Sequence, residues 1–300
     1  MEVIHLNNNE IKPILEPLCC AIGNFDGVHL GHQKLINESK LHGYKSAVLT
    51  FNPHPSIFLK KINNYPLLTP LLMKEKIISG LGIDYLIILE MNDEVLKYSK
   101  ERFMDLLDSL NIKSIVCGYD FTFGYKALGN ISDLKERFKV FEISKYTIDD
   151  IRVSSTYIKE LLSSGNIKEA NHLLGHDYSI IGNVTYGRKK GRLIGFPTAN
   201  LYHDGYYLPK NGVYFVTVKY KDNEYLGMCN IGHNPTFNFQ ANLSVEVHIF
   251  DFDLNIYDDI IWVSFKEKIR DEKKFSSVLE LKNQLEEDKM KCILLGNFKK

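Results

Sequence analysis

The sequence predicts an α/β domain built on a parallel sheet, followed by a smaller antiparallel β domain with a helix at its end. Short apolar runs alternate with stretches of helical period through the first half of the chain. This alternation is typical of a parallel sheet with helices packed on it. After Gly175 the pattern changes to strand-like runs joined by turns. The 300-residue length is enough for two domains.

The strands of the parallel sheet are predicted from five apolar runs, at residues 18–25, 46–53, 85–90, 114–121 and 139–144. Helix-period stretches lie between them, at residues 32–43, 71–82 and 101–110. Ligands of such sheets bind at the carboxyl ends of the strands, where loops lead into helices. We therefore expect the first functional site in the loops that follow these runs.

Two short helices are expected at residues 154–175, the second capped by Asn166 and Glu169 and ended by Gly175. We place the domain boundary after them, which gives domains 1–176 and 177–300. Antiparallel strands are then predicted at residues 178–187, 212–220, 243–252 and 260–265, with a turn at 221–224. The closing helix has Ser277 as its cap, Glu280 three residues later, and an apolar face formed by Val278, Leu281 and Leu285.

The formal net charge of zero argues against general nucleic-acid binding, which needs a basic surface. A local phosphate site remains compatible with it. The polar N-terminus lacks the layout of a signal peptide, and no apolar run approaches the ~20 residues that span a bilayer. Since the five cysteines form no CxxC pair, we expect buried free thiols rather than zinc or disulfides. These features predict a cytoplasmic protein without a membrane, nucleic-acid or obligate protein partner.

The segment GNFDGVHLGH, residues 23–32, follows the first strong strand and leads into a helix. The first N–H groups of a helix are unpaired and favour an anion. Gly27 and Gly31 allow an anion to approach closely, and the imidazoles of His29 and His32 can donate to it from one helix face. This arrangement suits nucleotidyl transfer, in which fixed donors stabilise charge on an α-phosphate. The alternative is two incidental histidines near a helix start.

Position, glycines and histidines together favour the phosphate site, and the segment resembles the HxGH element of the nucleotidyltransferase superfamily. Neither a Walker A sequence nor a clean GxGxxG competes with it. GYDFTFG places Asp120 after another strand, where it faces adenosine or a metal; the alternative is a turn with two buried aromatics, Phe121 and Phe123. In FNPHP, His54 is either a site residue or a loop histidine facing solvent.

Three hydroxyls stand at a helix start in VSSTYIK, residues 153–159. Alone they are ordinary caps, but here they resemble the SSTxIR element of the same superfamily, which cradles the β- and γ-phosphates. That element implies phosphate contacts for Ser155 and Thr156. Lys159 stands where the element has arginine, so the charge is kept and the planar fork is lost.

A second constellation is GRKKGRLIGFPTAN, residues 187–200. Its recurring glycines among cations indicate a mobile loop over phosphates; they are Gly187, Gly191 and Gly195. Pro197 precedes two oxygen-bearing side chains, Thr198 and Asn200, which suit Mg²⁺ with a nucleotide. The alternatives are a solvated basic face and a simple turn.

Glu246 alternates with the apolar residues of 243–253 and so points away from their face. It is either a base for a hydroxyl or a solvent-exposed glutamate. NIGHNPTF and KIRDEKKF add Asn230 and Arg270, which could touch a flavin or its phosphate.

Together these motifs resemble the prokaryotic bifunctional riboflavin kinase/FAD synthetases over nearly the whole chain. The resemblance implies a Rossmann-like FMN adenylyltransferase domain and a riboflavin kinase domain on a small antiparallel barrel. It implies that the loop residues Asn24, Phe25 and Asp26 join the motif residues above in binding ATP for adenylylation, and that Thr198 and Asn200 contact Mg·ATP. Glu246 is the implied kinase base. Asp258 stands where the family tends to have glycine, which implies a tight or strained turn.

Two other functions stay open at this stage. One is a nucleotidyltransferase that acts on another phosphate ester, such as phosphopantetheine, with an appended barrel. The PTAN and VEVH segments argue against it. The other is a flavin-binding protein with decayed sites, against which the intact His29, His32 and Glu246 argue.

Overall fold

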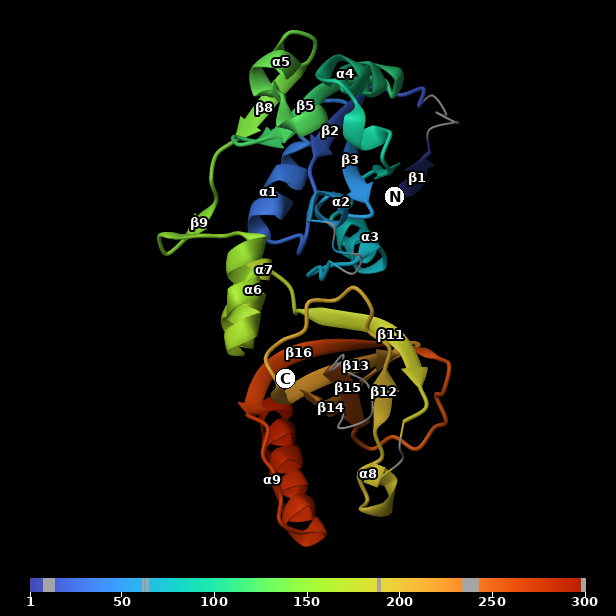
Figure 1. Ribbon diagram of the computed structural model, residues 1–300, viewed down its shortest axis with the longest axis vertical. Helices are drawn as coiled ribbons and strands as arrows, with labels where there is room; N and C mark the ends of the chain where they lie inside the picture. Colours follow the sequence, from blue (N-terminus) through green and yellow to red (C-terminus); the bar gives the residue numbers. More distant parts are fainter. Residues whose placement is uncertain (8–13, 61, 63–64, 188–189, 234–242, 298–300) are drawn as a thin grey trace. The chain divides into compact units, whose positions relative to one another are not determined.

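The computed structural model describes residues 1–7, 14–60, 62, 65–187, 190–233 and 243–297. The chain divides into two compact units, Met1–Ser155 and Thr156–Lys300 (Figure 1). The first contains a six-stranded parallel sheet and the second a closed antiparallel barrel. The predicted fold class is therefore confirmed.

The sheet of the first unit has the strand order β1-β4-β3-β2-β5-β8, and every neighbouring pair is parallel. Its strands are β1 Glu2–Leu6, β2 Leu18–Ile22, β3 Lys45–Asn52, β4 Tyr85–Glu90, β5 Ile112–Gly118 and β8 Lys139–Ile143. All five predicted strands are present. The strand β1 was not predicted, because an edge strand that is mostly exposed carries little apolar signal.

Helices cover both faces of this sheet. They are α1 Leu30–Glu38, α3 Leu71–Gly80, α4 Lys100–Ser109 and α5 Ile131–Lys135. Successive residues of β2 point to opposite faces. Ala21 therefore packs with Ile36 of α1 and Ile78 of α3, whereas Cys20 packs with Leu107 of α4.

The side of the sheet on which successive strands are added changes at β2. From β2 the chain adds β3 and β4 on one side, and it later adds β5 and β8 on the other. Ligands of open α/β sheets bind outside the carboxyl ends of the strands at such a reversal. The segments 23–32 and 118–124 follow β2 and β5, so both motifs lie at this point of the sheet.

The first unit also contains several short elements. They are α2 Ser56–Lys60, η1 Val95–Lys97, β6 Thr122–Phe123, η2 Tyr125–Ala127, β7 Gly129–Asn130, β9 Thr147–Ile148 and β10 Ile151–Arg152.

The barrel of the second unit has the closed order β11-β12-β15-β14-β13-β16. Its strands are β11 Ser179–Thr185, β12 Ala199–Leu201, β13 Gly212–Tyr220, β14 Asn223–His233, β15 Leu243–Ile249 and β16 Ile260–Arg270. The turn predicted at 221–224 joins β13 to β14. Asp258, at φ 66°, adopts the left-handed conformation that favours glycine, which agrees with the strained turn expected there.

Two helices precede the barrel, α6 Ser155–Ser164 and α7 Ile167–Leu174. Asn166 caps α7 by accepting from the Glu169 N–H at 3.4 Å, and Gly175 ends the helix at φ 72°. The amide of Asn171 ties α7 to the barrel, donating to Phe265 O at 2.8 Å. The compact units group α7, and α6 from Thr156 onward, with the barrel. The predicted domain boundary after residue 176 stays a prediction.

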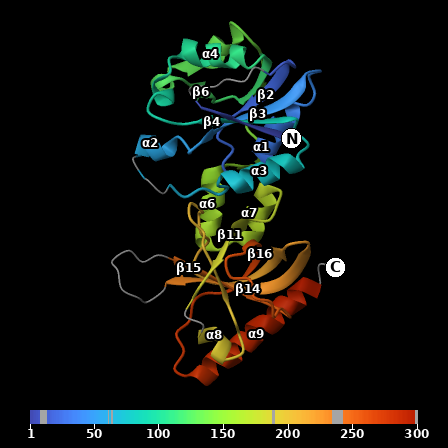
Figure 2. The same cartoon turned by 90° about the vertical axis from the view of Figure 1, so that its right-hand side faces the viewer.

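The closing helix α9, Val278–Asn297, packs against β13, β14 and β16 (Figure 2). Ser277 Oγ accepts from the Glu280 N–H at 3.1 Å, which confirms the predicted cap. The Glu280 carboxylate reaches back one residue further than a capping box does, accepting from Ser276 N at 2.8 Å.

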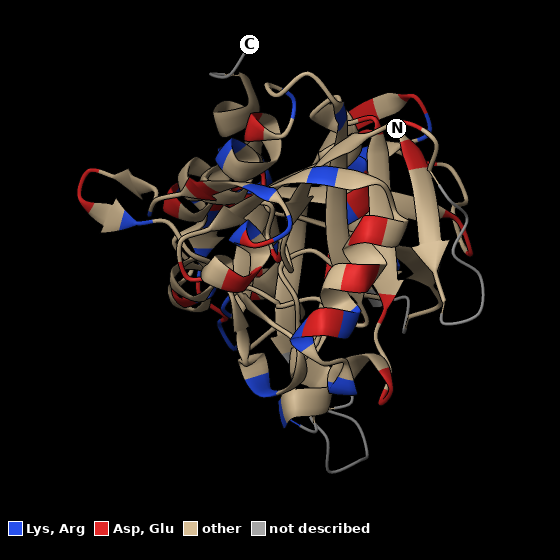
Figure 3. Cartoon of the chain, turned by 90° about the horizontal axis from the view of Figure 1, so that it is seen from above, with Lys and Arg blue, Asp and Glu red and all other residues tan. Residues whose placement is uncertain are grey.

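All five cysteines are buried and unpaired, as predicted. Acidic and basic segments are interspersed along the ribbon in Figure 3. Among the described residues, no cluster of three or more His, Cys, Asp or Glu side chains is arranged to hold a metal ion. No helix in this part of the chain is both long and apolar enough to cross a membrane.

Candidate functional site

The loop between β2 and α1 is fastened to the segment that leads into α3. Asp26 Oδ1 accepts from the backbone N–H groups of Leu68 at 2.7 Å and Thr69 at 3.1 Å. Thr69 Oγ1 in turn accepts from Gly27 N at 2.7 Å. The Asp26 carboxylate thus holds the loop in place, and its contact with ATP stays a prediction.

This loop has a strained backbone. Phe25 and Val28 are fully buried and have positive φ angles of 49° and 39°, and Gly27 between them has φ 91°. A positive φ is unfavourable for a β-branched residue and persists only where the surroundings enforce it. One enforcing contact is the Gln33 amide, which donates to Val28 O at 2.8 Å.

His29 and His32 are brought together at the start of α1. His29 is the N-cap residue, and its Nδ1 accepts from His32 N at 3.2 Å, so the proton of the neutral His29 ring is on Nε2. The two rings stack with centroids 3.6 Å apart. Burial, His29 and Lys74 hold the pKa of His32 well below its usual 6.5, so its ring is neutral at physiological pH. The pair therefore places ring N–H donors beside the helix N-terminus, an arrangement suited to an anion.

Four other residues predicted for this site are Gly31, Ser155, Thr156 and Lys159. Ser155 Oγ donates to Asp26 O at 2.7 Å, so the hydroxyl motif reaches the loop. A Cβ at Gly31 would lie 3.3 Å from the His29 ring. Thr156 and Lys159 continue α6 in the second unit, where Lys159 Nζ lies 5.5 Å from the ring centroid of Tyr207. Their contacts with the phosphates of ATP stay predictions.

Asp120 forms an ion pair with Arg152 of β10 at 3.1 Å, and both side chains are more than half exposed. Its contact with adenosine or a metal stays a prediction. The alternative is a turn with two buried aromatics. Phe123 is buried, with its ring centroid 5.2 Å from that of Phe103, and Phe121 is half-buried.

His54 lies in the loop two residues before α2 and is half-buried. Its Nδ1 accepts from Ser56 N at 3.1 Å, and its ring stacks on Tyr65 with centroids 5.5 Å apart. The ring is therefore packed rather than directed freely into solvent.

A second group of predicted residues meets on the barrel. On β15, Val245 and Val247 are buried in the apolar interior, and Glu246 between them faces the other side. Glu246 lies opposite Asn200 of β12 and also opposite Asn230 of β14. Three polar side chains thus lie in a row across three neighbouring strands.

Two of the three, Glu246 and Asn230, line a cavity of about 770 Å³ in the second unit, whereas Asn200 is not among its lining residues. Its polar wall includes predicted residues from distant parts of the sequence: Gly191, Thr198, Asn230, Glu246 and Arg270. Its apolar wall includes Phe196, Phe275 and two residues of the predicted apolar face of α9, Leu281 and Leu285. The cavity can therefore hold a flat apolar group with Glu246 at its side.

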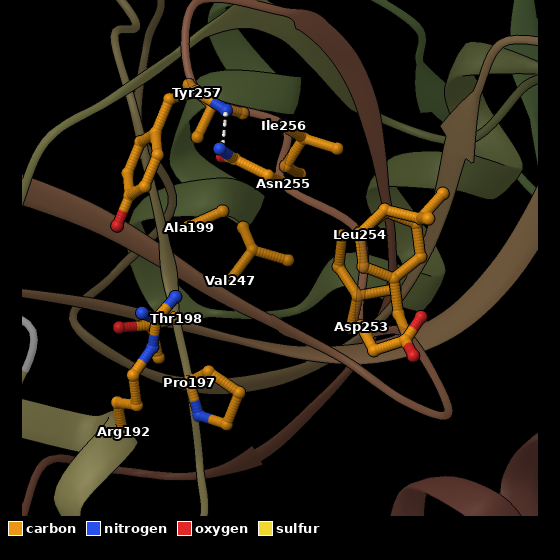
Figure 4. Close-up of a pocket in the computed structure, with 13 residues that line it drawn as sticks. Arg192, Pro197, Thr198, Ala199, Val247, Asp253, Leu254, Asn255, Ile256 and Tyr257 are labelled. Atoms are coloured by element: carbon orange, nitrogen blue, oxygen red, sulfur yellow. Dashed lines mark hydrogen bonds between the residues drawn. The ribbon is translucent and has the colours of Figure 1, made fainter.

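A second cavity of about 450 Å³ adjoins the first, since Thr198 lines both. Figure 4 shows Arg192, Pro197, Thr198 and the ring of Tyr257 around it. The Tyr257 ring stacks on Tyr186 with centroids 4.1 Å apart. A cation, a hydroxyl and an aromatic pair are groups that can bind a nucleotide.

Two of the three predicted glycines of residues 187–200 allow close packing, whereas Gly195 has a positive φ of 88° and open space around it. A Cβ at Gly187 would lie 1.9 Å from Asn200 Nδ2, and one at Gly191 would lie 2.2 Å from Phe196 O. Part of the expected loop is a short helix, α8 Lys190–Leu193. The cations Arg188 and Lys189, the side chain of Lys190 and the end of NIGHNPTF lie outside the described residues.

Arg270 lines the larger cavity and also anchors α9. Its Nε donates to both carboxylate oxygens of the buried Asp288, at 3.1 and 2.9 Å. Its expected contact with a flavin stays a prediction.

The two halves of the chain match two families. Residues 11–157 match the family described as FAD synthetase, and residues 174–294 match riboflavin kinase. A protein of Bacillus subtilis described as a bifunctional riboflavin kinase/FMN adenylyltransferase is 38% identical over 98% of both chains. One of Listeria monocytogenes with the same description is 39% identical over 89% of both chains.

The chain belongs to the bifunctional riboflavin kinase/FMN adenylyltransferase family. A crystal structure described as a macrolide-efflux protein from Streptococcus pneumoniae matches with a TM-score of 0.88 and 32% identity, over 97% of this chain and 98% of that one. The fold of this family member therefore has a close experimental counterpart.

Sequence reasoning missed three side chains at the sites of this family member: Thr69, Lys74 and His248. Thr69 and Lys74 bond to the loop before α1 across more than forty positions of the sequence, which no local pattern signals. His248 shares the parity of Glu246 and lines the larger cavity, so its position in the strand was the available signal. Its Nδ1 bonds to Pro197 O at 2.7 Å, and burial lowers its pKa below the usual value.

Proposed function

We propose that the chain performs both reactions named by its family: the phosphorylation of riboflavin to FMN, and the adenylylation of FMN to FAD with release of pyrophosphate. The observation that carries the kinase assignment is the pair Glu246 and Asn230 on the wall of a mostly apolar cavity, which a nucleotide-sized cavity joins at Thr198; Asn200 lies opposite Glu246 on the neighbouring strand. The adenylyl-transfer assignment rests on the stacked histidines at the α1 N-terminus.

In the kinase reaction the larger cavity takes the flavin ring and the smaller one takes ATP. Glu246 accepts the proton of the ribityl 5′-hydroxyl while the hydroxyl oxygen attacks the γ-phosphate. The bond between that phosphorus and the β,γ-bridging oxygen breaks, and ADP leaves. Thr198 lies where the two cavities meet, so the transfer takes place beside it.

Mg²⁺ with ATP fits the donor set at Thr198 and Asn200. Both supply neutral oxygens, and Mg²⁺ commonly binds one or two protein groups together with substrate phosphates. The ion would neutralise phosphate charge during transfer. The close approach of Gly187 to the Asn200 amide limits the movement of that side chain.

In the second reaction a phosphate oxygen of FMN attacks the α-phosphate of another ATP. The bond from the α-phosphorus to the leaving oxygen breaks, and pyrophosphate is released. The Nε2–H of His29, His32 and the first N–H groups of α1 stabilise the charge that develops on the α-phosphate. This mechanism needs positioning and charge stabilisation, and no covalent intermediate on the protein.

We further propose that the activities divide after residue 176, close to residue 174, where the riboflavin kinase match begins. We also propose a cytoplasmic enzyme without an obligate protein partner. The zero net charge and the interspersed charged residues argue against a nucleic-acid partner.

The test is incubation with riboflavin, ATP and Mg²⁺, followed by chromatography of flavins and nucleotides. We expect FMN with ADP first and then FAD with pyrophosphate, and no product when the metal is chelated. Flavin binding without turnover would instead support a binding protein with decayed sites. Adenylylation of phosphopantetheine in place of FMN would support the other nucleotidyltransferase.

A further inference from the structure

Lys74 is a buried lysine beneath the first candidate site. It lies on α3 with only 3% of its surface exposed. Its Nζ donates to Asn24 O at 2.7 Å and to Thr50 Oγ1 of β3 at 3.1 Å. Thr50 Oγ1 also donates to Asn24 O, at 3.2 Å. The carbonyl of Asn24 thus accepts hydrogen bonds from two elements, the helix α3 and the strand β3.

The charge of Lys74 is unusual for its surroundings. A buried ammonium is costly unless it is paired, and an apolar side chain would fill this place more cheaply. Within the described part of the chain no carboxylate forms an ion pair with it, and its two bonded acceptors are neutral. Burial lowers its pKa to about 8, against a smaller opposing effect of Asp26. Packing of α3 alone does not explain a lysine here.

The position of Lys74 connects this charge with the site. Asn24 directly precedes the strained turn of Phe25 to Val28, which leads to His29 and His32. Lys74 is also close enough to His32 to lower the pKa of its ring. The ammonium has three N–H donors, and the described residues supply two acceptors for them.

We propose that Lys74 is a positioning residue for adenylyl transfer: its ammonium holds the Asn24 carbonyl, and thereby the turn that presents His29 and His32, and it places a positive charge beneath the anion-binding end of α1. This inference rests on the proposed adenylyltransferase function. A purely structural lysine would only fasten α3 to the loop, and its charge state would not affect the reaction.

The pH profile separates these two roles. The titratable groups that face Lys74 are Asp26 on the loop and His32 on α1, while β3 contributes the neutral Thr50. His32 is already neutral in the alkaline range. A fall in kcat/KM for ATP as pH rises through about 8 therefore reports loss of the Lys74 proton in the free enzyme.

The experiment measures FAD formation from FMN, ATP and Mg²⁺ by the full chain, from about pH 6.5 to about 10. Lys74→Met should lower kcat/KM by about 10²-fold, mainly through kcat, because the donor is lost while the shape is kept. Lys74→Arg should stay within about tenfold of wild type and lose the fall near pH 8, because arginine keeps its charge. Lys76→Met, at an exposed position of the same helix, should match wild type.

Riboflavin phosphorylation by the same preparations and thermal unfolding show whether each variant is folded. A wild-type rate and pH profile for Lys74→Met would overturn the proposal. An unchanged alkaline fall in Lys74→Arg would overturn it as well, even if Lys74→Met does not fold. If the wild type makes no FAD, the proposed function fails instead, so the two failures are distinguishable.

Discussion

The Nδ1–H of His248 donates a hydrogen bond to the carbonyl of Pro197 over 2.7 Å. This bond joins β15, which carries Glu246, to the residue before Thr198. His248 is buried, and its ring lies 5.1 Å from that of Phe196. The spacing between the candidate base and the candidate metal ligand therefore depends on an imidazole that is protonated at Nδ1.

The lowered pKa of His248 predicts how stability depends on pH. In the unfolded chain a histidine takes up a proton near pH 6.5, whereas burial holds the folded His248 neutral to lower pH. The unfolded state then binds more protons, so stability falls as pH falls through 6.5 toward the folded pKa. The pKa of His32 is also lowered in the folded protein, so this residue changes the stability with pH in the same direction. His248→Asn, which keeps an N–H donor, should show a smaller drop in Tm between about pH 7.5 and about 5.5. An unchanged drop would contradict this assignment.

Glu246→Gln should abolish FMN formation selectively. The amide cannot accept the proton of the attacking hydroxyl, and loss of a general base lowers rates by about 10²–10⁴-fold. FAD formation from supplied FMN should continue. Glu224→Gln, at an exposed position of β14, is the matched control. If both activities fell together in a folded protein, the assignment of two separate sites would be wrong.

His32→Ala should have the reverse effect. Removing one preorganised donor at a phosphate that gains charge costs on the order of 10²–10³-fold, so FAD synthesis should fall while riboflavin phosphorylation persists. His42→Ala tests a histidine paired with Glu38 at 3.1 Å, outside the site, and should leave both rates unchanged. An unaltered FAD rate in His32→Ala would return the histidine pair to an incidental role.

Substitutions of Lys159 test the effect of having a lysine where the SSTxIR element has arginine. If its ammonium meets the β- or γ-phosphate, Lys159→Ala should raise the ATP concentration needed for FAD synthesis and leave the kinase unaffected. Lys159→Arg should keep or improve ATP use, because a guanidinium binds phosphate through two parallel N–H bonds. ATP titrations of FAD formation decide the matter. Three coinciding curves would show that Lys159 is outside the site.

The domain boundary predicts the behaviour of two fragments. Residues 177–300 contain the barrel and α9 and should fold and convert riboflavin to FMN, with modest stability. Residues 156–300 should unfold at a higher temperature, because Asn171 keeps its bonds to Phe265 O and to Tyr178 N, both at 2.8 Å. An insoluble or inactive shorter fragment beside an active longer one would move the functional boundary before α6.

The sequence was informative wherever a site residue belonged to a local pattern. The loop GNFDGVHLGH could be placed because a buried strand precedes it and a helix follows. Glu246 could be oriented because strand residues alternate between faces. Both predictions depend on the order or the alternation of residues within one short segment, which the local sequence determines.

Contacts between distant segments could not be predicted. Lys74 looks like an ordinary polar residue of a helix, and only the packing of α3 under the Asn24 carbonyl shows otherwise. Asp288 likewise has the appearance of a solvated helix residue, yet it is buried against Arg270. In each case the tertiary partner, rather than the local sequence, determines the environment of the charge.

Apolar core residues and candidate site residues alternate along β15, so one strand register positions both. Val245 and Val247 are buried on one face of the strand, where Val247 also lines the smaller cavity, and Glu246 and His248 on the other face line the larger cavity. A slip of one residue would push a carboxylate into the apolar interior and turn two valines outward. Any insertion or deletion within this strand therefore damages core and site at once. Evolution can adjust the catalytic face only by substitution, and the apolar pattern that stabilises the barrel also protects the position of the base.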